Sequence, residues 1–451
     1  MRASRLGRYS WTMFDWANQP FYTLIMTFVF SVYFTDVFID GGNGAEKLTL
    51  TQTISGIVIA LLSPVLGSIT DIKGNRKFLM GITSLFFILG MYLLWYSPPG
   101  APDGIWLVML GLILASTMVG FAEVFNNSAL ATIETPENSG WLSGLGYGVG
   151  YISGLLALII FLLVFVWPGG ETDNLYGLDT SQYEHIRIVG PLCAIWYAFF
   201  IVPLFLFTPD MKKQNITVSQ SVKIGLGNFF QTFREVRKYQ NIFTFLITRM
   251  FYQDALNALY VVGGIYASLV VGMSLTQVLI LGIILNIFSG PSSIYGGYLN
   301  DKFGSKNVIN ISLWGLFIVG ALGLSIDKDT IFYFIDVSSS SASVEKLTFG
   351  IFSSVSQITY VCIVIGISFF YGPVQTASRA LMVKLSPPDK TTQFFGLYAF
   401  AGKSTAWLVP GLMTLILALT DSLQLAMISI VAFNLIGIIG MYFVYDESSI
   451  K

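Results

Sequence analysis

Apolar stretches near 20 residues long recur along the whole sequence, and they constrain its fold more than any other feature. Bounded by polar residues, glycine or proline, they form two sets of six. A stretch of this length crosses roughly 30 Å of hydrocarbon as an α-helix, in which the backbone hydrogen bonds are internal. Only 11% of the 451 residues are charged, whereas a soluble domain carries about 25%. The sequence therefore predicts an all-α membrane protein with twelve transmembrane helices.

The predicted spans fall into two groups separated by a long polar connection. Their ranges are 14–36, 51–70, 78–96, 105–127, 141–166 and 188–208, then 242–271, 276–299, 307–326, 350–373, 394–418 and 423–445. This layout predicts an N-terminal six-helix bundle over 1–208, a cytosolic connecting loop over 209–241 and a C-terminal six-helix bundle over 242–451. Phenylalanines in the loop are spaced for an amphipathic surface helix, at Phe229, Phe230 and Phe233.

The distribution of Lys and Arg predicts that both termini lie in the cytosol. Of the 24 Lys and Arg residues, 18 fall on segments that this orientation places inside, 4 on outer loops, and 2, Arg249 and Lys403, within predicted spans. The first apolar run is full length and follows no small-residue cleavage site, so we interpret it as a span and not as a removable signal. We expect an integral multi-pass protein of the cell (inner) membrane.

Composition and motifs exclude several kinds of function. A net charge of -1 without a long basic block gives no reason to expect nucleic acid. One histidine and the isolated Cys193 and Cys362 form neither a metal-ligand cluster nor a Cys/His catalytic pair, so we expect no metal and no enzyme activity. No nucleotide-binding loop of the form GxxxxGK[ST] is present. The glycines of the fifth span follow no strand, so a close helix contact is favoured over a cofactor site. We therefore expect no cofactor.

A loop motif occurs after the second predicted span and again after the eighth. Its residues are Gly67, Asp71, Gly74 and Arg76 in the first copy and Gly297, Asp301, Gly304 and Lys306 in the second. The first glycine permits close helix approach, the Asp can face a helix N-terminus or a basic residue, and the second glycine allows a tight turn. Packing and orientation explain the motif as well as a role in a cytosolic gate does.

This motif and the six-plus-six layout resemble the major facilitator superfamily over the whole chain. The first copy departs from the family pattern at Ile72 and Asn75, and the second at Asn307, where basic residues are common. The resemblance implies two pseudo-symmetric six-helix bundles that rock about a central cavity and expose it to either side in turn.

Three stretches resemble one branch of that superfamily, which contains the fungal autophagy-related vacuolar amino-acid effluxer and its bacterial relatives. They run from Phe14 to Asn18, from Tyr371 to Arg379 and from Phe394 to Ser404. The resemblance implies a secondary transporter, with amino-acid export as the candidate activity.

An Asp followed three residues later by an Asn occurs in both the first and the seventh predicted spans. The pairs are Asp15 with Asn18 and Asp254 with Asn257, 239 positions apart. Residues three apart lie on one helical face, so each pair can present a carboxylate and an amide to the same cavity. The resemblance implies that these two helices face the central cavity. We therefore expect these four residues at the substrate or coupling site.

Lys403 and Gln375 complete the substrate and coupling candidates. A charged side chain inside the span 394–418 is costly and faces a partner or a wet cavity. Lys403 can neutralise Asp15 or Asp254 or bind a substrate carboxylate, and a permanent structural ion pair also explains it. Gln375 lies in one of the stretches that resemble the effluxer branch.

Three further charged residues lie nearer the predicted cytosolic helix ends. They are Glu123, Arg249 and Arg379. For these residues an inner-gate or snorkelling role is favoured over substrate contact.

The expected partners are a small-molecule solute, membrane lipids and a coupling proton or cation, and we expect the chain to work as a monomer. Two alternatives stay open: a non-transporting receptor or scaffold on the same fold, and a transporter of another solute such as a sugar or a drug. Ligand affinity without flux would identify the first alternative, and the class of solute bound would identify the second.

Overall fold

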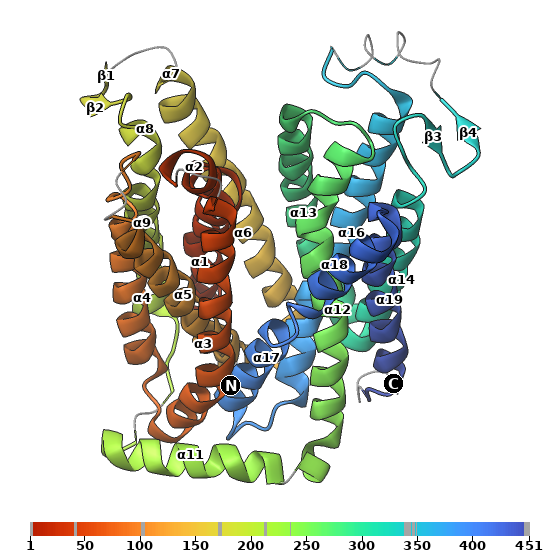
Figure 1. The fold of residues 1–451 in the computed structure, drawn as a ribbon. Coiled ribbons are helices and arrows are strands. Elements are labelled where there is room, and N and C mark those ends of the chain that lie inside the picture. The colour runs from red at the N-terminus through yellow and green to blue at the C-terminus, as the bar shows by residue number, and fades with distance from the viewer. Residues whose placement is uncertain are drawn as a thin grey trace. The chain divides into compact units, whose positions relative to one another are not determined.

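The computed structural model describes residues 3–39, 43–100, 104–169, 174–211, 214–234, 236–337, 344, 348 and 350–445, and most of these are helical (Figure 1). Five of the basic residues that set the predicted orientation lie outside the described residues: Arg2, Lys212, Lys213, Lys346 and Lys451.

Eleven helical segments among the described residues are long and apolar enough to cross a membrane. They are Arg5–Phe38, Gly44–Lys73, Arg76–Leu93, Ile105–Ile133, Pro136–Val166, Glu184–Phe207, Thr276–Phe303, Ser305–Gly323, Val355–Leu385, Thr391–Thr420 and Leu423–Tyr442. Each overlaps one predicted span. The remaining predicted span, 242–271, is the 30-residue helix α12 (Gln240–Leu269), whose N-terminal half carries Arg249, Gln253 and Asp254 and is therefore less apolar.

The chain divides into two compact units, which are described separately. The first contains Met1–Glu235 and Met382–Phe400, and the second contains Val236–Leu381 and Ala401–Lys451. Residues 382–400 thus come from the second set of predicted spans and pack within the first unit. The bundle boundaries expected at 208 and 242 stay a prediction.

The first unit is built on pairwise packing of long apolar helices. Helix α4 packs against α5, α1 against α6, and α3 against both α5 and α11. Its elements are α1 (Arg5–Pro20), η1 (Phe21–Phe28), α2 (Phe30–Tyr33), η2 (Phe34–Phe38), α3 (Gly44–Lys73), α4 (Arg76–Leu93), α5 (Ile105–Ile133), η4 (Pro136–Asn138), α6 (Ser139–Phe161), η5 (Leu162–Val166), α7 (Trp167–Gly169), β1 (Asn174–Leu175), β2 (Leu178–Asp179), α8 (Glu184–Arg187), α9 (Val189–Phe200), α10 (Val202–Phe207) and α11 (Val218–Arg234).

The second unit is centred on α19, which packs against α12, α14 and α18. Its elements are η6 (Val236–Tyr239), α12, α13 (Leu275–Phe303), α14 (Ser305–Gly323), β3 (Thr330–Ile331), β4 (Ile335–Asp336), α18 (Leu408–Thr420) and α19 (Leu423–Tyr442). Two helices pass from one unit to the other, α16 (Val355–Leu385) and α17 (Thr391–Lys403). Strands β1 and β2 pair antiparallel, and so do β3 and β4.

Helix α11 forms within the predicted connecting loop and lies across one end of the other helices of the first unit (Figure 1). It is attached to α3 by the Ser68 hydroxyl, which donates to the Gly225 carbonyl at 2.9 Å. Phe230 on the same helix is 60% exposed, as expected for an amphipathic helix with one face outward.

The eleventh span is interrupted by a turn between α17, which ends at Lys403, and α18, which begins at Leu408. Pro410 explains the break, because its ring would clash with the Ala406 carbonyl and its nitrogen has no hydrogen to donate. As the third residue of α18, it occupies a helical first turn, where proline is tolerated. The predicted span 394–418 is therefore present but is not one continuous helix.

Close approach of α3 and α17 depends on two glycines. A Cβ added at Gly67 would collide with the carbonyl of Thr392, and one added at Gly396 would collide with the carbonyl of Ser63. Backbones that pack at this distance leave no room for a methyl group. The first glycine of the loop motif therefore has the packing function expected for it.

We expect Gly67→Ala to destabilise the protein by about 1–3 kcal/mol, because the added methyl forces the α3 and α17 backbones apart. Thermal unfolding of the purified protein in detergent measures the change. Gly56→Ala on the same helix is the control, since nothing lies within 4 Å of a Cβ at that position. Its stability should stay the same or rise by up to about 1 kcal/mol, because alanine favours the helix. Equal melting temperatures for both variants would contradict the close approach.

Candidate functional site

The Asp71 carboxylate lies at the N-terminus of α17. It accepts hydrogen bonds from the backbone amides of Thr392 at 2.9 Å and Gln393 at 2.8 Å. These amides have no partner within the helix, and the positive end of the helix dipole favours a carboxylate there. Asp71 therefore occupies one of the two environments expected for it, a helix N-terminus within the first unit.

The second glycine of each motif copy makes the turn that follows. Gly74 has a φ of 66° and Gly304 a φ of 84°, and each donates its N–H to the carbonyl four residues earlier. Residues other than glycine rarely adopt such positive φ values. The two copies thus end α3 and α13 in the same way.

The basic residues of the two copies lie at helix ends. Lys77 Nζ donates to the Phe205 carbonyl of α10 at 2.9 Å, and Lys306 Nζ donates to the Tyr442 carbonyl of α19 at 3.2 Å. A cation near unpaired C-terminal carbonyls is favourable. Arg76 is 3% exposed and interacts electrostatically with Asp71.

The second copy differs around its acid. Asn300 Nδ2 donates to Asp301 Oδ1 at 3.2 Å, and Gly297 is buried beside them on α13. The gate role expected for all eight motif residues stays a prediction.

An acidic set in the first unit consists of Asp15, Tyr22, Glu123 and Tyr147. The Tyr22 hydroxyl donates to Glu123 Oε1 at 2.6 Å, and Tyr147 and Asp15 act electrostatically on the same hydroxyl. The set thus joins residues from α1, η1, α5 and α6. The Glu123 carboxylate in this set suits a ligand with a positive charge.

The glycine face of α6 brings the acidic set close to α1. A Cβ at Gly150 would lie 3.2 Å from the Asp15 carbonyl, and one at Gly154 would collide with the Thr23 hydroxyl. The expected helix contact of these glycines is therefore with α1 and with η1, which carries Thr23. Asn18, the expected companion of Asp15, is 3% exposed.

An amide network in the second unit consists of Arg249, Gln253, Asn257 and Gln375. Gln253 Oε1 accepts from Arg249 Nη2 at 3.4 Å and from Gln375 Nε2 at 3.2 Å, while Gln253 Nε2 donates to Asn257 Oδ1 at 3.0 Å. Arg249, Gln253 and Gln375 are each less than 9% exposed. The structure thus joins Asn257 and Gln375, two predicted site residues, to the guanidinium of Arg249.

Asp254 does not share the hydrogen bonds of the amide network. Its Oδ2 accepts the backbone N–H of Val409 at the start of α18, at 3.1 Å. Its Oδ1 is buried without a hydrogen-bond partner among the described residues, and the residue is 2% exposed. Lys403, a candidate partner of Asp254, is exposed at the end of α17, and its ammonium has no hydrogen bond or ion pair within the described chain.

Arg379 is 1% exposed on α16, close to a hydroxyl pair. The neighbouring Ser378 Oγ lies 2.8 Å from the Tyr252 hydroxyl of α12. The hydroxyl pair joins α16 to α12 beside Arg379 in the sequence, and the gate role expected for Arg379 stays a prediction.

Three residues of these sets were not among the site residues predicted from the sequence: Gln253, Tyr22 and Tyr147. Gln253 lies between Arg249 and Asn257 at intervals of four, so helical spacing was the signal that could have found it. Tyr22 lies seven residues after Asp15, two helical turns away. Its bond to Glu123 joins residues 101 positions apart, which no local pattern indicates.

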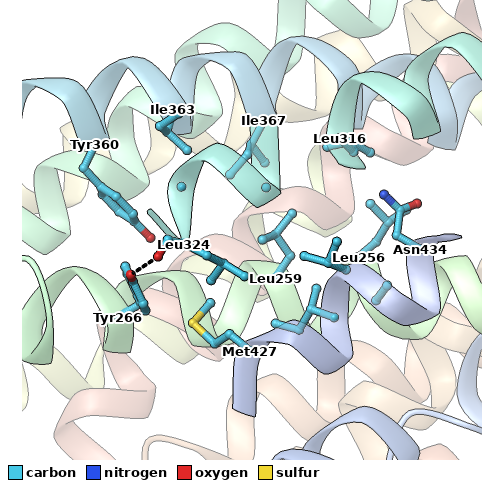
Figure 2. Close-up of a pocket in the computed structure, with 15 residues that line it drawn as sticks. Leu256, Leu259, Tyr266, Leu316, Leu324, Tyr360, Ile363, Ile367, Met427 and Asn434 are labelled. Carbon is cyan, nitrogen blue, oxygen red and sulfur yellow. Dashed lines mark hydrogen bonds between the residues drawn. The ribbon is translucent and has the colours of Figure 1, made fainter. Parts of the chain in front are cut away.

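The second unit also holds a small apolar cavity of about 30 Å³. Figure 2 shows Tyr266, which donates to the Leu324 carbonyl at 3.0 Å, at one end of the cavity and Asn434 at the other. Such a volume holds about two water molecules. It is too small for a solute in the conformation described.

Comparison with known proteins connects the chain to one family. The family model described as "Vacuole effluxer Atg22 like" matches residues 131–451. The chain is 25% identical over 450 residues to the "Uncharacterized MFS-type transporter YxiO" of Bacillus subtilis (strain 168), covering 98% of this chain and 95% of that protein. It is 24% identical over 244 residues to "Autophagy-related protein 22" of Cryptococcus neoformans var. neoformans serotype D (strain B-3501A), covering 53% of this chain and 42% of that one.

Solved structures show the same fold. The proton:xylose symporter XylE superposes with a TM-score of 0.71 at 14% identity, covering 98% of this chain and 95% of XylE. The transporter FucP in the outward conformation superposes with a TM-score of 0.66 at 12% identity, covering 98% of each chain. The fold expected from the sequence, that of the major facilitator superfamily, is confirmed.

We expect Asp71→Ala to speed hydrogen–deuterium exchange at the beginning of α17, because the Thr392 and Gln393 amides lose their acceptor. The lost stabilisation should be about 2 kcal/mol, as for a hydrogen bond to a charged group. Mass spectrometry of peptides covering residues 391–396 measures it. Asp389→Ala, which removes an exposed carboxylate just before the same helix, should leave the exchange rate nearly unchanged. Equal rates in the two variants would contradict the cap.

Proposed function

We propose that this chain, which belongs to the Atg22-like family of vacuole effluxers within the major facilitator superfamily, is a secondary transporter that exports amino acids. Family membership supports movement of a small solute by alternating access. The family description names effluxers, which supports export over uptake. The amino-acid class is supported by the resemblance to the effluxer branch and by one observation in the second unit, the buried Arg249 guanidinium beside amide groups.

An amino acid carries a carboxylate, and the amide network of the second unit is suited to that group. The network offers the Arg249 guanidinium, whose planar fork binds a carboxylate with two parallel hydrogen bonds. Gln375 and Asn257 add amide groups beside it. This assignment gives Arg249 a substrate contact in place of the gate role expected from sequence.

The membrane orientation belongs to the same proposal. The excess of Lys and Arg on the predicted inner segments supports cytosolic termini. With this orientation, α11 lies on the cytosolic side, where its exposed apolar residues contact the inner leaflet. We assign the chain to the cell (inner) membrane and to function as a monomer.

Transport is coupled to a proton at Asp254 or Asp15. Asp254 is buried and has one carboxylate oxygen without a hydrogen-bond partner among the described residues, so a proton there removes a charge that is costly in a low-dielectric site. Lys403 is exposed and without such a partner in the described chain, so its ammonium can alternate with the proton as the partner of Asp254.

We expect amino acids to raise the melting temperature of the purified protein, because a ligand at 100 times its dissociation constant stabilises by about 2.7 kcal/mol. A thermal-shift screen of amino acids, peptides, sugars, nucleosides and drugs measures this. The amino acids that bind should then show flux in proteoliposomes.

The other outcomes of the screen separate the alternatives. Stabilisation by sugars or drugs alone would replace amino acids with that solute class. Stabilisation by amino acids without flux would favour a receptor. For a stabilising amino acid, Arg249→Lys should weaken affinity about tenfold or more, since Lys lacks the bidentate fork. Arg5→Lys is the exposed control.

We expect Asp254→Asn to abolish the dependence of flux on a pH gradient, because an amide cannot take up the proton that a carboxylate can. Flux into proteoliposomes with and without an imposed gradient measures the dependence. Asp421→Asn, an exposed carboxylate at the other end of α18, should keep the wild-type response. If flux in Asp254→Asn still depends on the pH gradient, Asp254 does not carry the proton. Asp15→Asn then shows whether Asp15 carries it or whether neither residue does.

A further inference from the structure

The break in the eleventh span is held by few hydrogen bonds. Across it, the Ala406 amide donates to the Lys403 carbonyl at 3.4 Å and the Leu408 amide donates to the Thr405 carbonyl at 2.8 Å. Both bonds span three residues, and the first is long. Regular bonds spanning four residues resume where Gly411 donates to the Trp407 carbonyl at 2.9 Å. The turn is therefore the weakest part of this span.

The two helices beside the break are attached within different units. Helix α17 up to Phe400 belongs to the first unit, where Asp71 of α3 caps its first amides. Helix α18 belongs to the second unit, where Asp254 of α12 accepts the Val409 amide. The chain passes from one unit to the other between residues 400 and 401, three residues before the turn.

The contacts of the turn with α12 are few and lie on one side. Thr405 Oγ1 donates to the Met250 carbonyl at 3.3 Å, and a Cβ at Gly402 would lie 2.8 Å from Arg249 Nη1. Trp407 is 68% exposed. Within the turn, Trp407 Nε1 donates to the Ser404 carbonyl at 3.1 Å. Few side-chain contacts with α12 therefore oppose a change of the backbone dihedral angles of the turn.

We propose that residues 404–407 are a hinge in the eleventh span, and that Asp254 is the positioning residue that keeps α18 on α12 when the hinge bends. Helix α17, capped by Asp71, then moves with the first unit, and helix α18, capped by Asp254, moves with the second. The inference of a hinge rests on the proposed function only in one respect, namely that bending of the hinge serves transport. The cap itself is a property of the second unit.

Two substitutions of Asp254 distinguish its role as a helix cap from its role in proton uptake. The side-chain oxygen of asparagine can still accept the Val409 N–H, as asparagine does at helix N-termini, but it takes up no proton. Alanine removes the acceptor. Hydrogen–deuterium exchange of peptides covering residues 405–413, in the full-length protein reconstituted in nanodiscs, reports on the cap without any solute.

We expect Asp254→Ala to speed exchange in these peptides about tenfold or more, and Asp254→Asn to stay within about threefold of the wild type, as loss or retention of one hydrogen bond from a buried amide predicts. Unchanged exchange in Asp254→Ala, or equal exchange in both variants, would overturn the positioning role. Asp254→Asn also guards against misfolding, because it keeps the size and the hydrogen bond of the side chain.

The hinge has its own test in Pro410→Ala, which removes the cause of the break. We expect this variant to slow exchange of residues 404–408 about threefold or more and to lower the maximal flux of the transported solute at unchanged KM, since a continuous helix resists bending. Pro388→Ala, in the exposed turn before α17, should change neither quantity. Slower exchange with full flux would overturn the hinge, and absence of flux in the wild-type protein would instead contradict the proposed function.

Discussion

Backbone amides at the beginning of a helix have no partner inside it, and in hydrocarbon no water supplies one. Two carboxylates meet this requirement in the eleventh span, Asp71 at α17 and Asp254 at α18. A broken helix in a membrane needs partners for the backbone groups that the break leaves free. Asp71 and Asp254 supply such partners at the beginnings of α17 and α18.

The charged residues of the spans are held by polar neighbours within each unit. In the first unit Glu123 accepts from Tyr22, and in the second Arg249 is joined to Gln253 while Asp254 accepts from Val409. Charged groups within spans are costly and are retained for function more often than for stability. The buried Arg249 guanidinium supports a solute that carries a carboxylate, and it is the physical basis for proposing amino acids over neutral sugars.

Local pattern predicted part of this site and missed the rest. The Asp-x-x-Asn spacing selected Asp254 and Asn257 together, because residues three apart share a helical face. Their hydrogen bonds differ all the same, since Asp254 bonds α18 and Asn257 bonds Gln253. A shared helical face limits the direction of two side chains only to the same broad sector around the helix. Which neighbour a side chain reaches depends on helices that are distant in the sequence, as α18 is from α12.

By itself the sequence determined the class of the protein, the places of its spans and the duplicated loop motif, because hydrocarbon imposes length and apolar composition on every segment that crosses it. It also contained Pro410, a residue that kinks or breaks a helix, although α3, α13 and α16 continue through Pro64, Pro291 and Pro373. Only the tertiary structure decided that Asp71 and Asp254 cap α17 and α18, that Tyr22 binds Glu123, and that residues 382–400 pack with the first unit. Those contacts join residues more than 100 positions apart, and their geometry follows from how whole helices pack.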